Sequence, residues 1–215
     1  TGRMNDTRFT ARGLTGASMY GITERSTVYP SELTTTAAWV SDPQTEEQRQ
    51  YCEAEAVYRE FVYRNYASVA PEDADIVADY FWKDYEPEHD NVYEAVCHIR
   101  KRLKERARYD GVEDDSGPVG VFLTQSVRAN PGFYATAAVE ALRSHGIPAR
   151  YVEGYYVSAA AIEHAESGIV ELTGRNTHAW VEIYFDGVGW LPVDFTPGYY
   201  YDARTLQQLV AAPDS

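Results

Sequence analysis

The chain has 215 residues, of which 33 are acidic and 19 are basic, so its formal net charge is −14 at pH 7. A chain of this length buries roughly 70% of its unfolded surface and needs no metal or disulfide staple to fold. Its acidity argues against nucleic acid as a partner and against docking on anionic lipid, because both need a basic face. Hydrophobic residues make up 44% and charged residues 24%, a balance that disfavours a largely disordered chain.

Membrane and redox signals are weak. No apolar run approaches the roughly 18 residues of a membrane span, so we expect no insertion within this chain. No signal peptide is recognisable, and the chain opens with Thr1, which suggests a piece of a longer protein. Cys52 and Cys97 do not make a disulfide framework and could form one bridge or none.

We expect one domain over residues 1–215. Its parts are an irregular segment at 1–43 with a possible strand at 34–40, a helical part at 44–148, an antiparallel sheet at 149–201 and a tail at 202–215.

The first half of the chain has helical periodicity. A helix is predicted over 44–66, capped by Ser41 or Asp42, with Pro43 at its first position. Its expected apolar face contains Tyr51, Ala54, Tyr58, Phe61, Val62 and Asn65. A short helix at 72–82 and a longer one at 91–108 follow, and residues 110–120 are loop-like by composition. The stripe of the longer helix contains Val92, Val96, Ile99 and Leu103.

A further helix begins at Asn130-Pro131, because Asn is a strong N-cap and Pro suits the first helical position. Gly146 is expected to end it. Its buried face would contain Tyr134, Ala135, Ala138 and Leu142, and its small residues suit close packing under a sheet.

The last third of the chain has strand periodicity. Strands are predicted at 150–157, 179–185 and 189–195, with a hairpin turn at Asp186-Gly187 and an irregular stretch at 158–168. Helices therefore precede an antiparallel sheet, so the predicted class is α+β.

His178 lies at the head of the second strand, and Asp194 lies near the end of the third. The hairpin brings these two ends together, so an imidazole–carboxylate hydrogen bond is expected. Such a carboxylate orients the histidine of a nucleophilic triad, although a cross-strand His–Asp pair is more often structural.

Several motifs carry a family resemblance. They are FVYRNY (61–66), FLTQ (122–125), FYATAA (133–138), GIPARYVEGY (146–155) and HAWVEIYFDGVGWLPVDFTPGYY (178–200). With them, residues 42–201 resemble the bacterial transglutaminase-like domain, a relative of the papain-like cysteine peptidases. The resemblance implies a triad of a Cys at the start of the helix leading to GIPAR, the His of HAW and the Asp before TP. The last two would be His178 and Asp194.

The resemblance places the nucleophile three residues before Tyr134, and there this chain has Pro131. Proline carries neither a nucleophile nor a backbone N–H that could stabilise an oxyanion. It is compatible with a first helical turn, so the substitution would keep the scaffold and delete the chemistry.

Substitutes for the nucleophile are poorly placed. Cys52 and Cys97 flank the stripes of earlier helices, where partly buried thiols are expected. Residues that would need a rebuilt site are Ser126, Thr124 and Thr136. His145 is expected in the last turn of its helix, and His89, His98 and His164 lack zinc-ligand spacing. No metal or cofactor is expected. Structural pairing or a place on a strand surface is expected for Arg150, Glu153 and Glu182.

The resemblance, together with Pro131, implies a pseudoenzyme, a non-catalytic extracytoplasmic interaction module of a larger membrane-anchored protein. The acidity of the chain and its many tyrosines suit a cationic, extended or sugar-linked partner, such as a peptide or cell-wall component. The alternatives are an active acyl transferase, which would hydrolyse peptides or crosslink amides, and an architectural domain without a ligand. The sequence predicts neither the ligand nor the oligomeric state.

Overall fold

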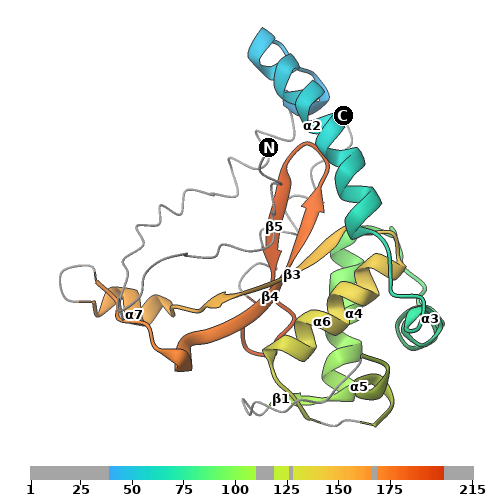
Figure 1. The fold of residues 1–215 in the computed structure, drawn as a ribbon, viewed down its shortest axis with the longest axis vertical. Coiled ribbons are helices and arrows are strands. Elements are labelled where there is room, and N and C mark those ends of the chain that lie inside the picture. The colour runs from blue at the N-terminus through green and yellow to red at the C-terminus, as the bar shows by residue number, and fades with distance from the viewer. Residues whose placement is uncertain (1–38, 110–118, 126–127, 166–168, 201–215) are drawn as a thin grey trace, which may run out of the picture.

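A computed structural model of the protein describes residues 39–109, 119–125, 128–165 and 169–200. A three-stranded antiparallel sheet packs against helices, which confirms the predicted α+β class (Figure 1). The strands, in the order in which they pair, are β3 (Ala149–Tyr155), β4 (Thr177–Phe185) and β5 (Gly189–Val193).

Helices precede the sheet in the chain. They are α2 (Glu46–Tyr66), α3 (Ala74–Trp82), α4 (Val92–Arg106), α5 (Val119–Gln125) and α6 (Pro131–Ser144). A short helix α7 (Ala159–Glu163) and a 3-10 turn η2 (Gly174–Asn176) lie between β3 and β4. A two-residue parallel pair, β1 (Arg108–Tyr109) with β2 (Arg128–Ala129), joins the end of α4 to the segment before α6. No helix in the described part of the chain is both long and apolar enough to span a bilayer.

Three local expectations are corrected. Residues 39–41 are helical, so the strand expected at 34–40 is wrong there, and 34–38 lie outside the described residues. Of the loop expected at 110–120, residues 110–118 also lie outside the described residues. Val119 begins α5, a helix whose Phe122 and Leu123 are buried in the core. The irregular stretch at 158–168 contains α7, where Ser158 Oγ accepts the Ala161 N–H at 3.1 Å.

The start and the face of α2 also differ from expectation. Thr45 is the N-cap and exchanges hydrogen bonds with Gln48 in a capping box, which displaces the predicted start at Ser41 to Pro43. Of the predicted apolar face only Val62 is fully buried, and Phe61 is 45% exposed. The reason is that α2 runs past the tip of the β4–β5 hairpin rather than across the core (Figure 1).

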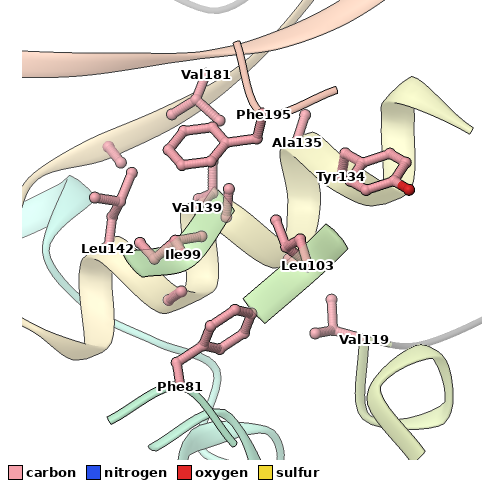
Figure 2. Packing of buried hydrophobic residues seen from close by; sticks show 14 of the residues in the cluster. Phe81, Ile99, Leu103, Val119, Tyr134, Ala135, Val139, Leu142, Val181 and Phe195 are labelled. Carbon is pink, nitrogen blue, oxygen red and sulfur yellow. The ribbon is translucent and has the colours of Figure 1, made fainter. Parts of the chain in front are cut away.

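The core lies between α6 and the sheet. Ala135, Ala138 and Leu142 of α6 are fully buried, as predicted, and α6 contacts both β3 and β4. Figure 2 shows Phe195 beside Val181 and α6. The alanines let α6 approach the strands closely, and each fully buried large apolar side chain contributes about 1.5–3 kcal/mol. Gly146 ends the helix with a φ of 78°, the left-handed conformation expected at that position.

His98 gives the fold a pH-dependent element. Its Nε2 lies 2.5 Å from the Phe81 carbonyl oxygen, and its ring stacks on Trp82 with centroids 5.6 Å apart. Burial lowers the pKa of His98 below its ordinary value. The neutral imidazole is therefore favoured in the folded state, and this stability is lost as the pH falls below about 6.5.

We expect His98→Gln, which stays neutral, to flatten the decline in stability between about pH 7 and pH 5, as measured by urea unfolding across this range. His89→Gln is the matched control, for which we expect the opposite change in the pH dependence of stability. The Glu94 hydrogen bond raises the pKa of His89, so the stabilisation from protonated His89 is present at low pH and lost as the pH rises. That variant should lose stability on the acid side. Parallel pH profiles for His98→Gln and wild type would contradict the prediction.

Candidate functional site

His178 and Asp194 are in direct contact. His178 Nε2 lies 2.5 Å from Asp194 Oδ2, which confirms the predicted hydrogen bond. His178 is the second residue of β4, and Asp194 follows the last residue of β5. Because Val181 pairs with Val193, His178 and Asp194 are diagonal neighbours, a separation that two polar side chains can span.

Three further hydrogen bonds fix Asp194. Its second carboxylate oxygen, Oδ1, accepts the Thr196 N–H at 2.8 Å, a side-chain turn that orients the carboxylate. Its backbone carbonyl accepts from Arg100 Nε at 3.0 Å and from Arg100 Nη2 at 2.6 Å. Asp194 is thus held at its carbonyl and at both carboxylate oxygens, which orients it firmly toward His178.

Arg100 is the residue of this site that the sequence analysis missed. It is buried on α4, and its guanidinium also lies over the Tyr200 ring, 4.4 Å from the centroid. The sequence did contain a signal for this position. Arg100 follows Val96 by four residues and precedes Leu103 by three, so it lies on the same helical face as both. An arginine in an apolar stripe is buried at a cost unless its donors find partners.

A pocket of about 270 Å³ opens beside the His–Asp pair. It is lined by Tyr155, Tyr156, Val157, His178, Trp180, Pro192, Val193, Asp194 and Tyr199. The Tyr199 ring stacks on the His178 imidazole, with centroids 4.4 Å apart and planes 24° apart. The Tyr156 ring meets Tyr199 edge-on at 4.9 Å. One face of the imidazole is therefore covered by an aromatic cluster.

Gly154 makes room for Trp180 in this wall. A Cβ on Gly154 would lie 2.6 Å from Cη2 of the Trp180 indole, too close for any side chain without displacement of the ring. Gly154 pairs with His178 across the sheet. The glycine therefore lets the indole lie against β3 next to the pair.

Pro131 occupies the first position of α6, as predicted. Asn130 is the N-cap, and its side chain accepts the Phe133 N–H at 3.1 Å. Among the described residues, His178 makes its hydrogen bond and ring contacts with Asp194, Tyr156, Trp180 and Tyr199, and none with Pro131.

Two tyrosine rings connect α6 to the pair. The ring centroid of Tyr134 on α6 lies 6.4 Å from that of Tyr109. The Tyr109 centroid lies 6.1 Å from that of Tyr199, the ring that covers His178. A chain of ring contacts thus runs from α6 to the His–Asp pair.

Neither thiol belongs to the pocket. Both cysteines are free, so the disulfide alternative is not realised. Cys52 on α2 is half-buried, but Cys97 on α4 is exposed, which corrects the expectation of a partly buried thiol, because Cys97 lies beside the buried stripe and not in it. Thr124 and Thr136 donate to helix carbonyls of Gly120 and Gly132, and Ser126 lies outside the described residues.

The remaining candidates have structural partners. His145 is the C-cap of α6 and lies 3.0 Å from Asp90, His89 contacts Glu94, and His164 contacts the Ala160 carbonyl. The strand residues pair as predicted. Arg150 and Glu182 form an ion pair at 2.6 Å, and Glu153 accepts the Tyr151 hydroxyl at 2.6 Å.

A family model and a curated protein match parts of this chain in sequence. Residues 83–195, just over half of the chain, match the family model of the transglutaminase-like superfamily. "Uncharacterized protein YebA" from Bacillus subtilis is 33% identical over 128 residues, which cover 54% of this chain and 17% of YebA.

Two crystal structures of the periplasmic domain of TgpA from Pseudomonas aeruginosa are also similar. The one bound to ethylmercury is 23% identical with a TM-score of 0.46, covering 69% of this chain and 52% of that one. The other is 20% identical with a TM-score of 0.43, covering 71% and 51%. The chain thus spans less than a fifth of YebA and about half of the TgpA domain. From the family match over residues 83–195, the chain belongs to the transglutaminase-like superfamily.

Proposed function

We propose that this domain is a non-catalytic interaction module that binds a peptide-like ligand beside a remnant His–Asp pair. One observation carries the proposal: Pro131 begins α6, the position at which the family resemblance calls for the nucleophilic cysteine. His178 and Asp194 keep the geometry that would orient a histidine, and a pocket opens next to them.

The chemistry of Pro131 explains why turnover would be lost. An oriented imidazole accelerates acyl transfer by taking a proton from a nucleophile, and a proline ring offers none. Proline also lacks the backbone N–H that could donate to an oxyanion. Cys52 and Cys97 lie on α2 and α4, and neither lines the pocket.

We further propose that the domain is extracytoplasmic and belongs to a larger membrane-anchored protein. The resemblance of the FVYRNY helix to those of such domains supports this location. The size of YebA, of which the chain covers 17%, supports a larger parent. Fractionation of cells that express the full-length parent, followed by protease treatment of the intact membrane, would test the location.

An active acyl transferase is the second candidate, favoured by the intact contact between His178 and Asp194. The pair alone does not decide between the two, because a carboxylate that holds an imidazole also stabilises a fold.

We expect wild-type protein to show no cysteine-dependent turnover. Incorporation of dansylcadaverine into casein and hydrolysis of casein would measure crosslinking and amidase activity, with and without prior iodoacetamide. Turnover that iodoacetamide abolishes would contradict the proposal and direct attention to Cys52 or Cys97.

Binding is tested separately from turnover. A pool of unmodified synthetic hexapeptides is added to ¹⁵N-labelled protein, and the indole N–H signal of Trp180, assigned with Trp180→Phe, reports on the pocket. A saturable shift without cleavage of the pool supports the module. An unperturbed signal at millimolar peptide would favour an architectural domain instead.

A further inference from the structure

The pocket beside His178 combines flat apolar rings with unused hydrogen-bond donors. Trp180, Tyr155 and Pro192 line it together with the tyrosines that cover His178. Tyr155 is 49% exposed. In the part of the chain that the structure describes, neither the Trp180 indole N–H nor the Tyr155 hydroxyl donates to any other residue. By contrast, the indoles of Trp82 and Trp190 are both hydrogen-bonded within the protein.

The carboxylate of the pocket is already engaged. The Asp194 carboxylate receives the His178 imidazole on one oxygen and the Thr196 N–H on the other. The Arg100 guanidinium lies on the Asp194 carbonyl, so a positive charge already faces this residue from the core. A cationic ligand would have to compete with these groups, which disfavours it.

We propose that the pocket binds a proline-rich segment in the polyproline II conformation. The inference rests on the proposed function, namely peptide binding at this pocket, and specifies the class of peptide. A polyproline II segment has no internal hydrogen bonds and presents its carbonyl oxygens to its surroundings. Proline residues carry no N–H. Such a ligand supplies carbonyl acceptors for the two free donors, and it does not need the carboxylate of Asp194, which is already hydrogen-bonded.

Shape and entropy agree with this complementarity. Proline rings pack on flat aromatic side chains, and a segment that is already extended loses little freedom on binding. Ligand pockets typically enclose about 300–1,000 Å³. At about 270 Å³ this one suits a few residues of an extended chain.

The test uses the 215-residue chain and an acetylated, amidated decaproline peptide. We expect saturable binding by calorimetry and a shift of the Trp180 indole signal. The Trp82 and Trp190 signals should stay in place, because those indoles donate to Ala141 and Ser144 and to Tyr58, outside the pocket. A glycine–serine decapeptide with the same end groups should not bind.

Two variants test the two donors. Tyr155→Phe removes only the hydroxyl oxygen and should weaken decaproline binding by about five- to tenfold, the effect of one lost hydrogen bond. Trp180→Phe removes the indole N–H together with part of the ring surface, so it should weaken binding by at least as much. Tyr63→Phe is the matched control, because it removes a hydroxyl that donates to Asp186 outside the pocket. Unchanged Trp82 and Trp190 signals verify folding of each variant.

The outcomes separate the two proposals. If the hexapeptide pool shifts Trp180 and decaproline does not, the ligand class is wrong and the peptide-binding module stands. If neither binds, both proposals fail. Decaproline that binds both pocket variants as tightly as wild type would overturn the inference, because the donors would then play no part.

Discussion

Replacing Pro131 with cysteine should create a thiol that iodoacetamide modifies about tenfold faster, or more, than Cys52 or Cys97 near pH 7. Pro131 is the first residue of the 14-residue helix α6, so the new thiolate would gain the positive end of the helix dipole. That field and a neighbouring imidazolium lower a thiol pKa from about 8.5 to the range of roughly 3.5–7.5. The thiolate is the reactive form, so its fraction sets the rate.

The fold should accept this change. A first-turn residue makes no intrahelical N–H bond, and the cap that Asn130 provides is independent of Pro131. Loss of the proline ring frees the unfolded chain and costs about 0.4–1 kcal/mol. Typical domains have a stability of about 5–15 kcal/mol, which exceeds this cost.

Mass spectrometry after short iodoacetamide pulses separates the three thiols by peptide. Thr136→Cys is the positional control, since it places a thiol on the same helix beyond its first turn, where ordinary reactivity is expected. In Pro131→Cys the rate should fall when His178→Ala is added. Equal rates with and without His178 would show that the imidazole does not reach the start of α6. Enzymatic turnover need not return, because Tyr199 covers one face of the imidazole.

The His–Asp pair was predictable because a hairpin is a local structure. The Asp186-Gly187 turn and the alternation of β4 set the register, and the register puts His178 near Asp194. The start of α6 followed in the same way from Asn130 and Pro131. In each case the residues that determine the geometry lie within one hairpin or one helical turn.

Contacts between distant segments were not predictable in this way. Arg100 reaches the Asp194 carbonyl across 94 residues of sequence, and Tyr51 reaches the Gly187 carbonyl across 136. Helical periodicity indicates which residues share a face, but it does not indicate what that face will meet. The face of α2 was predicted wrongly for this reason: it meets a hairpin tip through polar groups, and one of these is the buried carboxylate of Glu55.

Glu55→Ala should lower the free energy of unfolding by about 2–4 kcal/mol, a large fraction of the stability of a domain. Glu55 is 8% exposed, and its Oε1 accepts the Tyr184 hydroxyl at 2.7 Å and the Gly187 N–H at 3.0 Å. Burial, and then the hydrogen bond to Glu55, raise the pKa of Tyr184, so this hydroxyl stays a donor. Alanine would leave two buried donors without an acceptor, at about 1–3 kcal/mol each.

Urea unfolding measures this loss, and two variants on the same helix calibrate it. Glu55→Gln retains a carbonyl oxygen for the two donors but loses the charge that faces Arg59 at 3.5 Å, so its cost should be smaller, about 1–2 kcal/mol. Glu53→Ala changes an exposed carboxylate and should stay within about 0.5 kcal/mol of wild type. The indole N–H signal of Trp190, which donates to Tyr58 of α2 at 3.0 Å, should shift in Glu55→Ala, because α2 would loosen from the hairpin. A loss in Glu55→Ala no larger than that in Glu53→Ala would show that the hairpin tip and α2 are held together without this carboxylate.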